Sequence, residues 1–198
     1  MKSVLVTGFE PFGGDAINPS LEAVKALVKF WDASASGTIL HTAQLPVTFA
    51  DAAPTLLRAV AATTPDVVIA VGYAAGSSEI RLERVAINVI DARIPDNAGS
   101  QPVDIPVDAG GPVAYFSTLP IKPALARLSE REIPAVVSDS AGTYVCNAVF
   151  YALQHALAGT ATCSGFVHVP ALGELAAPQS GADALAEALK VVIEASLL

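Results

Sequence analysis

The residue best placed for nucleophilic chemistry is Cys146, in the stretch SDSAGTYVCNAVFYALQHAL at positions 138–157. The pattern of residues 144–157 predicts a helix with Cys146 in its first turn. Unpaired backbone N–H groups and the helix dipole favour negative charge there, so a thiol at that point is stabilised as a reactive thiolate. The alternative interpretation is a small apolar core residue, because free cysteine is among the most buried residue types.

A cysteine nucleophile needs a general base within hydrogen-bond reach, and the sequence contains three histidines. His155 follows Cys146 on the same predicted helix, on nearly the opposite face and about 13 Å along the axis, which excludes it if the helix is continuous. His41 falls inside a strand pattern. His168 ends a short predicted strand just before Pro170, so it is the candidate base by elimination. A hydrogen-bonded histidine at a strand end is the alternative interpretation.

A third group should orient the imidazole, and spacing alone does not choose it. The acidic residues in or near the relevant loops are Glu10, Glu83, Asp91, Asp96 and Asp139. Most carboxylates in such loops are simply solvated. The second cysteine, Cys163, falls in a predicted connector, and we interpret it as structural. A bridge between Cys146 and Cys163 is an alternative that a reducing compartment argues against.

The elements that must position these residues alternate between apolar strands and helices. We expect strands at residues 4–7, 38–45, 67–71, 85–90, 133–137 and 165–169. We expect one helix that starts at residues 18–20 and others at 47–62, 117–132, 144–157 and 182–198. Ser117 or Thr118 should cap the 117–132 helix, and Pro54 implies a kink in the 47–62 helix or a later start. This alternation predicts an α/β fold with a mainly parallel sheet. Active groups gather at the carboxyl ends of strands in such folds, so we expect Cys146 and His168 to share one rim.

Composition limits the classes of partner. A chain of 198 residues with 53% hydrophobic residues is expected to form one domain, 1–198. The net charge is −8, and 11 Lys and Arg form no cluster, which argues against nucleic acid and anionic membranes as partners. No apolar run reaches the roughly 20 residues of a membrane span. The amino end reads as a strand rather than a signal peptide, so we expect a cytoplasmic protein.

The loop after the first predicted strand, GFEPFGGDAINPS, carries two aromatic residues beside glycines. Phe9 and Phe12 there either close the edge of the core or form a wall for a planar ligand. The G-x-G-x-x-G spacing of a dinucleotide site is missing, and no His/Cys cluster has metal-ligand spacing. We therefore expect no cofactor and no metal.

Five segments together carry a more specific signal: VTGFEPFGG…NPS, ERVAIN…DARIPDN, GGPVAYFSTLPIK, SAGTYVCN and GFVHVP. Their order and spacing resemble the pyroglutamyl peptidase I (pyrrolidone-carboxylate peptidase) family over nearly the whole chain except its carboxyl-terminal end. The resemblance implies a three-layer α/β/α sandwich with a mainly parallel, mixed sheet. It also implies a homo-oligomer, either a tetramer or a dimer.

The resemblance further implies a cysteine peptidase that removes an N-terminal pyroglutamyl residue from peptides through a thioester intermediate. Its nucleophile corresponds to Cys146 of VCN, its base to His168 of GFVHVP, and its third member to Glu83 of ERVAIN. The first two agree with the independent interpretation above. The choice of Glu83 comes from the resemblance alone.

The resemblance also implies a pocket for the pyroglutamyl lactam, which is a flat, uncharged ring without a free amine. The implied pocket residues are Phe9 and Phe12 as an apolar wall, Ile94, Tyr144 and Val145 beside them, Asn18 stabilising the loop, and Arg93 near the reacting carbonyl. Backbone N–H groups at the start of the Cys146 helix are expected to help hold developing oxyanion charge.

The sequence departs from the family pattern at three places. Ser77 stands where an Arg is common, Tyr73 where a Gln is frequent, and the segment HVPALGELAAPQS lacks the usual longer stretch with aromatic residues. These departures bear on the pocket and the subunit interface. Two alternative functions remain: a non-catalytic binder of pyroglutamyl-capped peptides, and a cysteine amidase with altered specificity.

Overall fold

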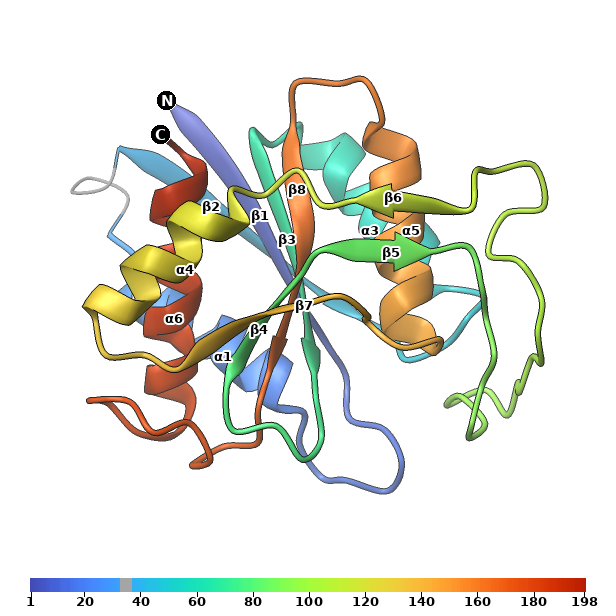
Figure 1. The fold of residues 1–198 in the computed structure, drawn as a ribbon, viewed down its shortest axis with the longest axis horizontal. Coiled ribbons are helices and arrows are strands. Elements are labelled where there is room, and N and C mark those ends of the chain that lie inside the picture. Colours follow the sequence, from blue (N-terminus) through green and yellow to red (C-terminus); the bar gives the residue numbers. More distant parts are fainter. Residues whose placement is uncertain (33–36) are drawn as a thin grey trace.

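A six-stranded sheet forms the centre of the computed structural model, which describes residues 1–32 and 37–198 (Figure 1). In spatial order its strands are β2 (Thr38–Leu45), β1 (Lys2–Phe9), β3 (Val67–Tyr73), β8 (Cys163–Val169), β4 (Ile80–Glu83) and β7 (Ala135–Ser138). Strand β4 runs antiparallel to β8, whereas the remaining pairings in this sheet are parallel. The expectation of a mainly parallel, mixed sheet is therefore confirmed.

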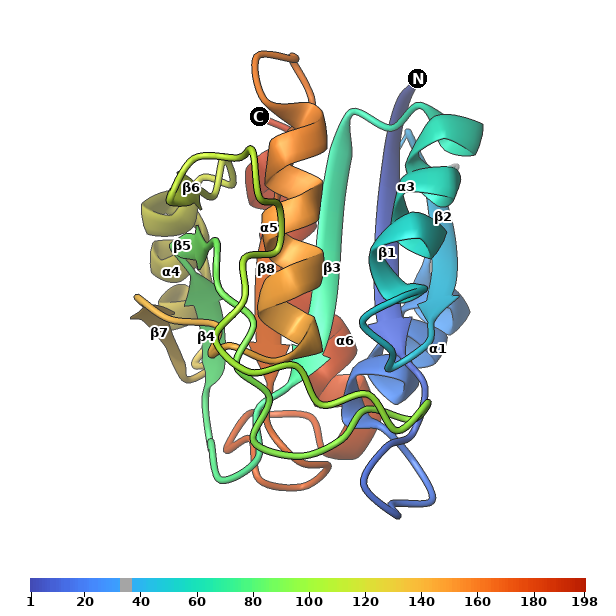
Figure 2. The same cartoon turned by 90° about the vertical axis from the view of Figure 1, so that its right-hand side faces the viewer.

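Helices cover the two faces of the sheet in separate layers (Figure 2). One layer holds α1 (Pro19–Phe30), α4 (Ile121–Glu130) and α6 (Gly181–Ser196), and the other holds α3 (Ala52–Thr63) and α5 (Val145–Leu157). Successive strand residues face opposite layers, as in any β-strand. Val4 packs in the core cluster of the first layer and Leu5 in that of the second. The result is the expected three-layer α/β/α sandwich.

A small second sheet lies beside α5 and consists of β5 (Val85–Ile87) and β6 (Ala114–Phe116), paired antiparallel. Residues 88–113 between these strands form the long excursion rich in Gly, Pro and Asp (Figure 1). An isolated bridge between Ile90 and Ile105 and a backbone hydrogen bond from Ala92 N–H to Pro102 O are among the contacts that hold this excursion together.

The predicted strand at residues 85–90 was wrong in its extent and its place. The chain instead forms β4 in the main sheet and then the short β5 in the small sheet. Strand β4 has the sequence IRLE, in which Ile80 and Leu82 are fully buried between charged neighbours. Its alternation spans too few residues to stand out, and its charges suggest a loop.

Other boundaries also differ from the predictions. Helix α3 begins at Ala52, so Pro54 falls in its first turn, where its missing N–H has no intrahelical partner to lose. Helix α4 begins at Ile121, after the position where Thr118 exchanges hydrogen bonds with Ser164 of β8 instead of capping a helix. Cys163 opens β8 rather than lying in a connector.

Candidate active site

His168 and Glu83 form a buried pair between two adjacent strands of the main sheet. His168 lies near the carboxyl end of β8 and Glu83 at the end of β4. His168 Nδ1 lies 2.8 Å from Glu83 Oε1. His168 is only 7% exposed and Glu83 is fully buried, so this contact is shielded from water. A carboxylate in that position fixes the orientation of the imidazole ring and leaves Nε2 free for chemistry.

Cys146 lies in the first turn of α5, as its sequence context predicts. The N-cap residue is Tyr144, whose hydroxyl donates to the carbonyl oxygen of Pro95 instead of capping the helix. The first N–H groups of α5 are therefore not capped by that side chain and can receive a developing negative charge. Cys146 is half-buried, so the protein does not fully enclose its side chain.

The backbone of Gly72 gives Cys146 its room. A Cβ atom at Gly72 would lie 2.9 Å from Cys146 Sγ and 2.8 Å from Cζ of Phe166. Gly72 is also the register partner of His168 across β3 and β8. Because Gly72 has no side chain, the thiol of Cys146 can approach the end of β3 at the position that pairs with His168 of β8.

The charge of His168 is set by its two neighbours. Burial lowers the pKa of the imidazole, but hydrogen bonding and charge interactions with Cys146 and Glu83 outweigh burial and raise the pKa to about 9. These interactions couple the thiol of α5 to the imidazole of β8. At neutral pH His168 is therefore held in its protonated form, able to stabilise a thiolate and to donate a proton.

Of the five acidic residues considered from the sequence, Glu83 is the one that contacts His168. Glu10 Oε1 accepts the backbone N–H of Val47, and Asp96 accepts those of Phe49, Ala98 and Ser100. Asp139 pairs with Arg84 at 2.8 Å, and Asp91 is exposed. The other four carboxylates thus hold loops or face solvent.

Next to Cys146 lies a small cavity with mostly apolar walls. Its lining residues come from the end of β1 and the loop after it, the segment after β2, the end of β3 and the start of α5: Phe9, Phe12, Asn18, Val47, Tyr73, Tyr144, Val145 and Cys146. Phe12 and Phe49 both pack against the ring of Tyr144, which stiffens this wall. Five of the seven pocket residues expected from the resemblance therefore lie on one cavity beside the thiol.

Asn18 holds the aromatic loop in shape. Its Nδ2 donates to the carbonyl oxygen of Glu10, and its Oδ1 accepts from the backbone and the hydroxyl of Ser20 at the start of α1. Ser20 Oγ in turn accepts the backbone N–H of Phe9. One buried amide thus ties the start of α1 to the loop between Phe9 and Phe12.

Arg93 and Ile94 are not among the described residues that line the cavity. Arg93 is exposed and Ile94 is half-buried. Their segment is nevertheless fastened to the residues that precede α5. Tyr144 donates to Pro95 O, and Thr143 exchanges hydrogen bonds with the backbone of Asp91.

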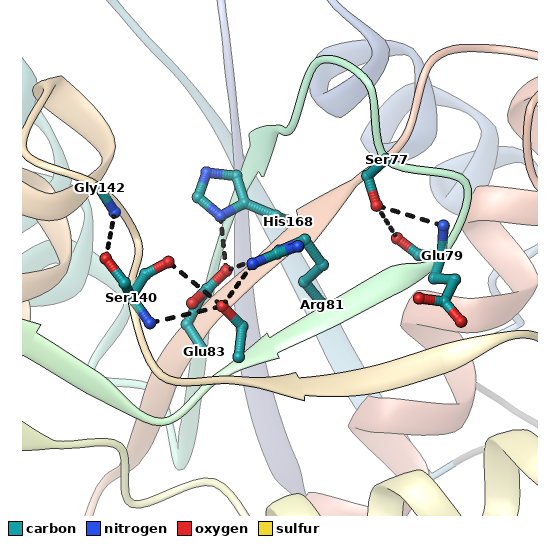
Figure 3. A network of polar contacts seen from close by, with 8 residues as sticks. Ser77, Glu79, Arg81, Glu83, Ser140, Gly142 and His168 are labelled. Atoms are coloured by element: carbon teal, nitrogen blue, oxygen red, sulfur yellow. Dashed lines mark hydrogen bonds and ion pairs between the residues drawn. The ribbon is translucent and has the colours of Figure 1, made fainter.

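Two of the three departures from the family pattern, Tyr73 and Ser77, lie at different distances from the cavity. Tyr73 lines the cavity beside Cys146. Ser77 lies outside the lining and folds back on its own loop, where its hydroxyl bonds the carbonyl oxygen and the N–H of Glu79 (Figure 3).

Asn147 is a site-supporting residue that we did not predict from the sequence. It is fully buried next to Cys146, accepts the backbone N–H of Ile87, and donates to the carbonyl oxygens of Ile87 and Val89. These bonds fix the first turn of α5 against the chain that follows β5. A polar amide in an otherwise apolar helix was the available signal.

The remaining cysteine and histidine residues lie elsewhere. Both cysteines are free thiols. Cys163 Sγ lies 3.2 Å from Thr118 O, and burial raises its pKa, which keeps it a thiol. His155 contacts Tyr115 and Asp108 on the far side of α5. Within residues 1–32 and 37–198, no three His, Cys, Asp or Glu side chains are grouped to hold a metal ion.

Comparison with known proteins covers the whole chain. The model of a family described as pyroglutamyl peptidase matches residues 2–197. The pyrrolidone-carboxylate peptidase of Vibrio parahaemolyticus is 52% identical over 198 residues, which cover 98% of this chain and 92% of that protein. The solved structure of pyroglutamyl peptidase I from Bacillus amyloliquefaciens has a TM-score of 0.91 and 40% identity, covering 100% of this chain and 95% of that one. A mutant pyrrolidone carboxyl peptidase from Pyrococcus furiosus has a TM-score of 0.90 and 43% identity, covering 98% of each chain.

Proposed function

This chain belongs to the pyroglutamyl peptidase family, and from that membership we propose that Cys146, His168 and Glu83 are its catalytic residues. The chain is a cysteine peptidase that removes an N-terminal pyroglutamyl residue from peptides. The observation that carries the assignment of residues is the coupling of His168 to both other members, with Glu83 Oε1 at 2.8 Å from Nδ1 on one side and Cys146 on the other.

The first half of the reaction is acyl transfer to sulfur. The Cys146 thiolate attacks the pyroglutamyl carbonyl carbon, and the carbonyl oxygen takes the negative charge beside the first N–H groups of α5. His168 then gives its Nε2 proton to the nitrogen of the departing peptide. The C–N bond breaks, the peptide leaves with a free amine, and a thioester joins the pyroglutamyl group to Cys146.

The second half is hydrolysis of the thioester. His168, now neutral, takes a proton from water at Nε2, and the resulting hydroxide attacks the thioester carbon. The C–S bond breaks and pyroglutamate leaves. Glu83 accepts the Nδ1–H bond throughout, so the ring keeps its orientation while its charge changes twice.

The lining of the cavity beside Cys146 matches the pyroglutamyl ring in polarity. The ring carries no charge, so apolar walls such as Phe9, Phe12 and Val145 accept it without an unpaired ionic group. We assign Tyr144 and Asn18 to the same pocket, Asn18 as the residue that holds its loop. We also assign Arg93 and Ile94 to the site, supported by the bond that ties their neighbour Pro95 to Tyr144.

The deciding experiment is release of the amine from a pyroglutamyl-amide reporter by the reduced protein. We expect turnover of the pyroglutamyl amide and little of matched prolyl and glutamyl amides, because the apolar lining accepts an uncharged ring and disfavours the free ammonium group that the other two carry. Binding without any turnover would favour the non-catalytic binder. Turnover of the prolyl or glutamyl amide in preference to the lactam would favour an amidase of altered specificity.

We further propose one peptidase domain spanning residues 1–198 that assembles as a dimer or tetramer in the cytoplasm. Exposed apolar side chains around the long excursion and β6 support a subunit interface, since Val103, Val113 and Phe116 are 66%, 87% and 71% exposed. Two free thiols fit a reducing compartment. Within the described residues no helix is both long enough and apolar enough to cross a bilayer. Light scattering should give a mass above 20.2 kDa, and a monomer would contradict the assembly.

A further inference from the structure

Arg81 stands beside the Glu83–His168 pair, although neither the sequence pattern nor the proposed mechanism gives it a role. It lies two residues before Glu83 on β4, so both side chains emerge on the same face of the sheet. Arg81 is also the register partner of His168 across β4 and β8. Its Nε lies 3.7 Å from Glu83 Oε1, the same oxygen that bonds His168 (Figure 3).

Glu83 needs such a neighbour. The carboxylate is fully buried, and its Oε2 has no hydrogen-bond partner among the described residues. A buried carboxylate with one unpaired oxygen is costly, so a nearby cation stabilises the charged form. The Arg81 side chain is 38% exposed, so it approaches the buried Glu83 carboxylate from the solvent side.

The other end of the Arg81 guanidinium reaches the turn that leads to Cys146. One terminal nitrogen of Arg81 donates to Ser138 Oγ at 2.9 Å. Ser138 Oγ donates to Ser140 O, and the backbone N–H of Gly142 donates to Ser140 Oγ (Figure 3). Ser138 ends β7, and residues 139–144 form the turn between β7 and α5, whose first turn carries Cys146. One side chain therefore contacts the third catalytic candidate and the segment that positions the nucleophile.

We propose that Arg81 is a positioning residue: its guanidinium holds the Glu83 carboxylate toward His168 and ties this pair to the turn that precedes the Cys146 helix. This inference rests on the proposed function. Arg81 touches neither the cavity nor the reacting atoms, and it acts through Glu83 and Ser138. Its planar, multi-donor group suits two acceptors at once, which an ammonium group does not.

The arrangement also sets the sign of an electrostatic effect. The charged and titratable groups around His168 in the described part of the chain are Glu83 and Arg81 from β4 and Cys146 from α5. Arg81 stabilises the negative charge of Glu83, and that charge raises the pKa of His168. Removal of Arg81 leaves the buried carboxylate less stable as an anion and less firmly held toward the imidazole, so the pKa of His168 should fall.

The test compares Arg81→Gln with Arg84→Gln in the full-length, reduced protein. Arg84→Gln is the matched control, because it also removes a cation from this region. The Arg84 guanidinium, however, pairs with Asp139 on the exposed side of the turn. We expect Arg81→Gln to lower kcat roughly tenfold with KM changed less than about twofold, since positioning is lost and ground-state binding is not. Histidine NMR should show a lower pKa for His168 in this variant. Arg84→Gln should match the wild type in both measurements.

Arg81→Lys keeps the charge without the planar group and should recover part of the lost kcat. Should the Gln variant fail to fold, Arg81→Met, which keeps the packing of the stem, replaces it. Wild-type kcat and an unchanged His168 titration in the neutral variant would overturn the proposal, as would an equal loss in Arg84→Gln. The NMR titration needs no turnover, so it tests the effect of Arg81 on His168 even if the wild type cleaves no pyroglutamyl amide.

Discussion

Glu83 reaches His168 diagonally across two antiparallel strands. In the register of β4 and β8, Glu83 lies opposite Phe166 and Arg81 lies opposite His168. Side chains two residues apart on one strand share a face, so the carboxylate and the imidazole meet over the same patch of sheet. Because both strands are interior strands of the main sheet, the ladder itself holds the pair at 2.8 Å.

This pair should set the alkaline limit of activity. Burial lowers the pKa of His168, and Cys146 and Glu83 together raise it to about 9. His168 must be protonated to release the amine, so wild-type kcat should persist to about pH 9 and fall above it. Glu83→Gln removes one of the raising interactions, and the fall should move to lower pH. Rate profiles against pH for both proteins check this, and an unmoved alkaline limb would count against Glu83 as the partner.

The same shift makes stability depend on pH. The pKa of His168 is raised from 6.5 in the unfolded chain to about 9 in the folded one. The folded state therefore holds the proton more tightly, and the stabilisation is fully present below about pH 6.5 and lost as pH rises through about 9. Urea unfolding at several pH values should show the advantage of wild type over Glu83→Gln shrinking across this window. A difference that stays constant or grows would contradict the assignment.

The two cysteines should respond differently to substitution. Cys146→Ser should lower kcat/KM by roughly a thousandfold or more, because a hydroxyl at this position is a far weaker nucleophile than a thiolate. Cys163→Ser should leave kcat/KM nearly unchanged, since burial raises the pKa of Cys163, and its Sγ, at the start of β8, contacts the carbonyl oxygen of Thr118. The reporter assay on both variants decides, and equal loss in the two would undo the choice of nucleophile.

The local patterns of the chain predicted most of the fold but not the third member of the site. The apolar run at residues 67–71 and the helical periodicity at 144–157 are patterns among residues close together in the sequence. Both predicted elements are present in the structure, as β3 and α5. Cys146 and His168 came from the same kind of reasoning. Glu83 did not, because it lies 85 positions from His168 in the sequence, and only the register of β4 against β8 brings them together.

Strand β4 shows why such residues are missed. Its four residues alternate between buried Ile80 or Leu82 and the charged Arg81 or Glu83. A charged side chain next to a buried one is typical of a solvated loop in sequence, yet here Glu83 is itself buried, and both charged side chains lie on the face of the sheet that carries His168. The same reasoning could not predict Ser138 as a partner of Arg81, because that contact depends on the pairing of β4 with β7.

Gly72 offers a steric test of the site. An added methyl group would lie 2.9 Å from Cys146 Sγ and 2.8 Å from the ring of Phe166, so one of them must move. We expect Gly72→Ala to lower kcat by about a hundredfold and to destabilise the fold by about 1–3 kcal/mol. Gly110→Ala is the control, because its nearest neighbour is Asp108 Oδ1 at 3.5 Å, an ordinary contact. Kinetics and thermal unfolding of both variants test this, and unaltered kcat in Gly72→Ala would mean that Cys146 has more room than its position indicates.

Asn18 allows the cap of α1 and the shape of the aromatic loop to be separated. Asn18→Ala removes the acceptor for Ser20 and the donor to Glu10 O, so it should destabilise the protein by about 1–2 kcal/mol and raise KM. Asn18→Asp keeps an acceptor at the helix start, where negative charge is favourable, but loses the donor to the loop. It should therefore recover most of the stability while KM stays raised, because the loop that carries Phe9 and Phe12 loses its tether. Denaturant unfolding and steady-state kinetics on the pair measure the two effects independently. If Asn18→Asp restored both stability and KM, the tether to Glu10 would have no part in shaping the pocket.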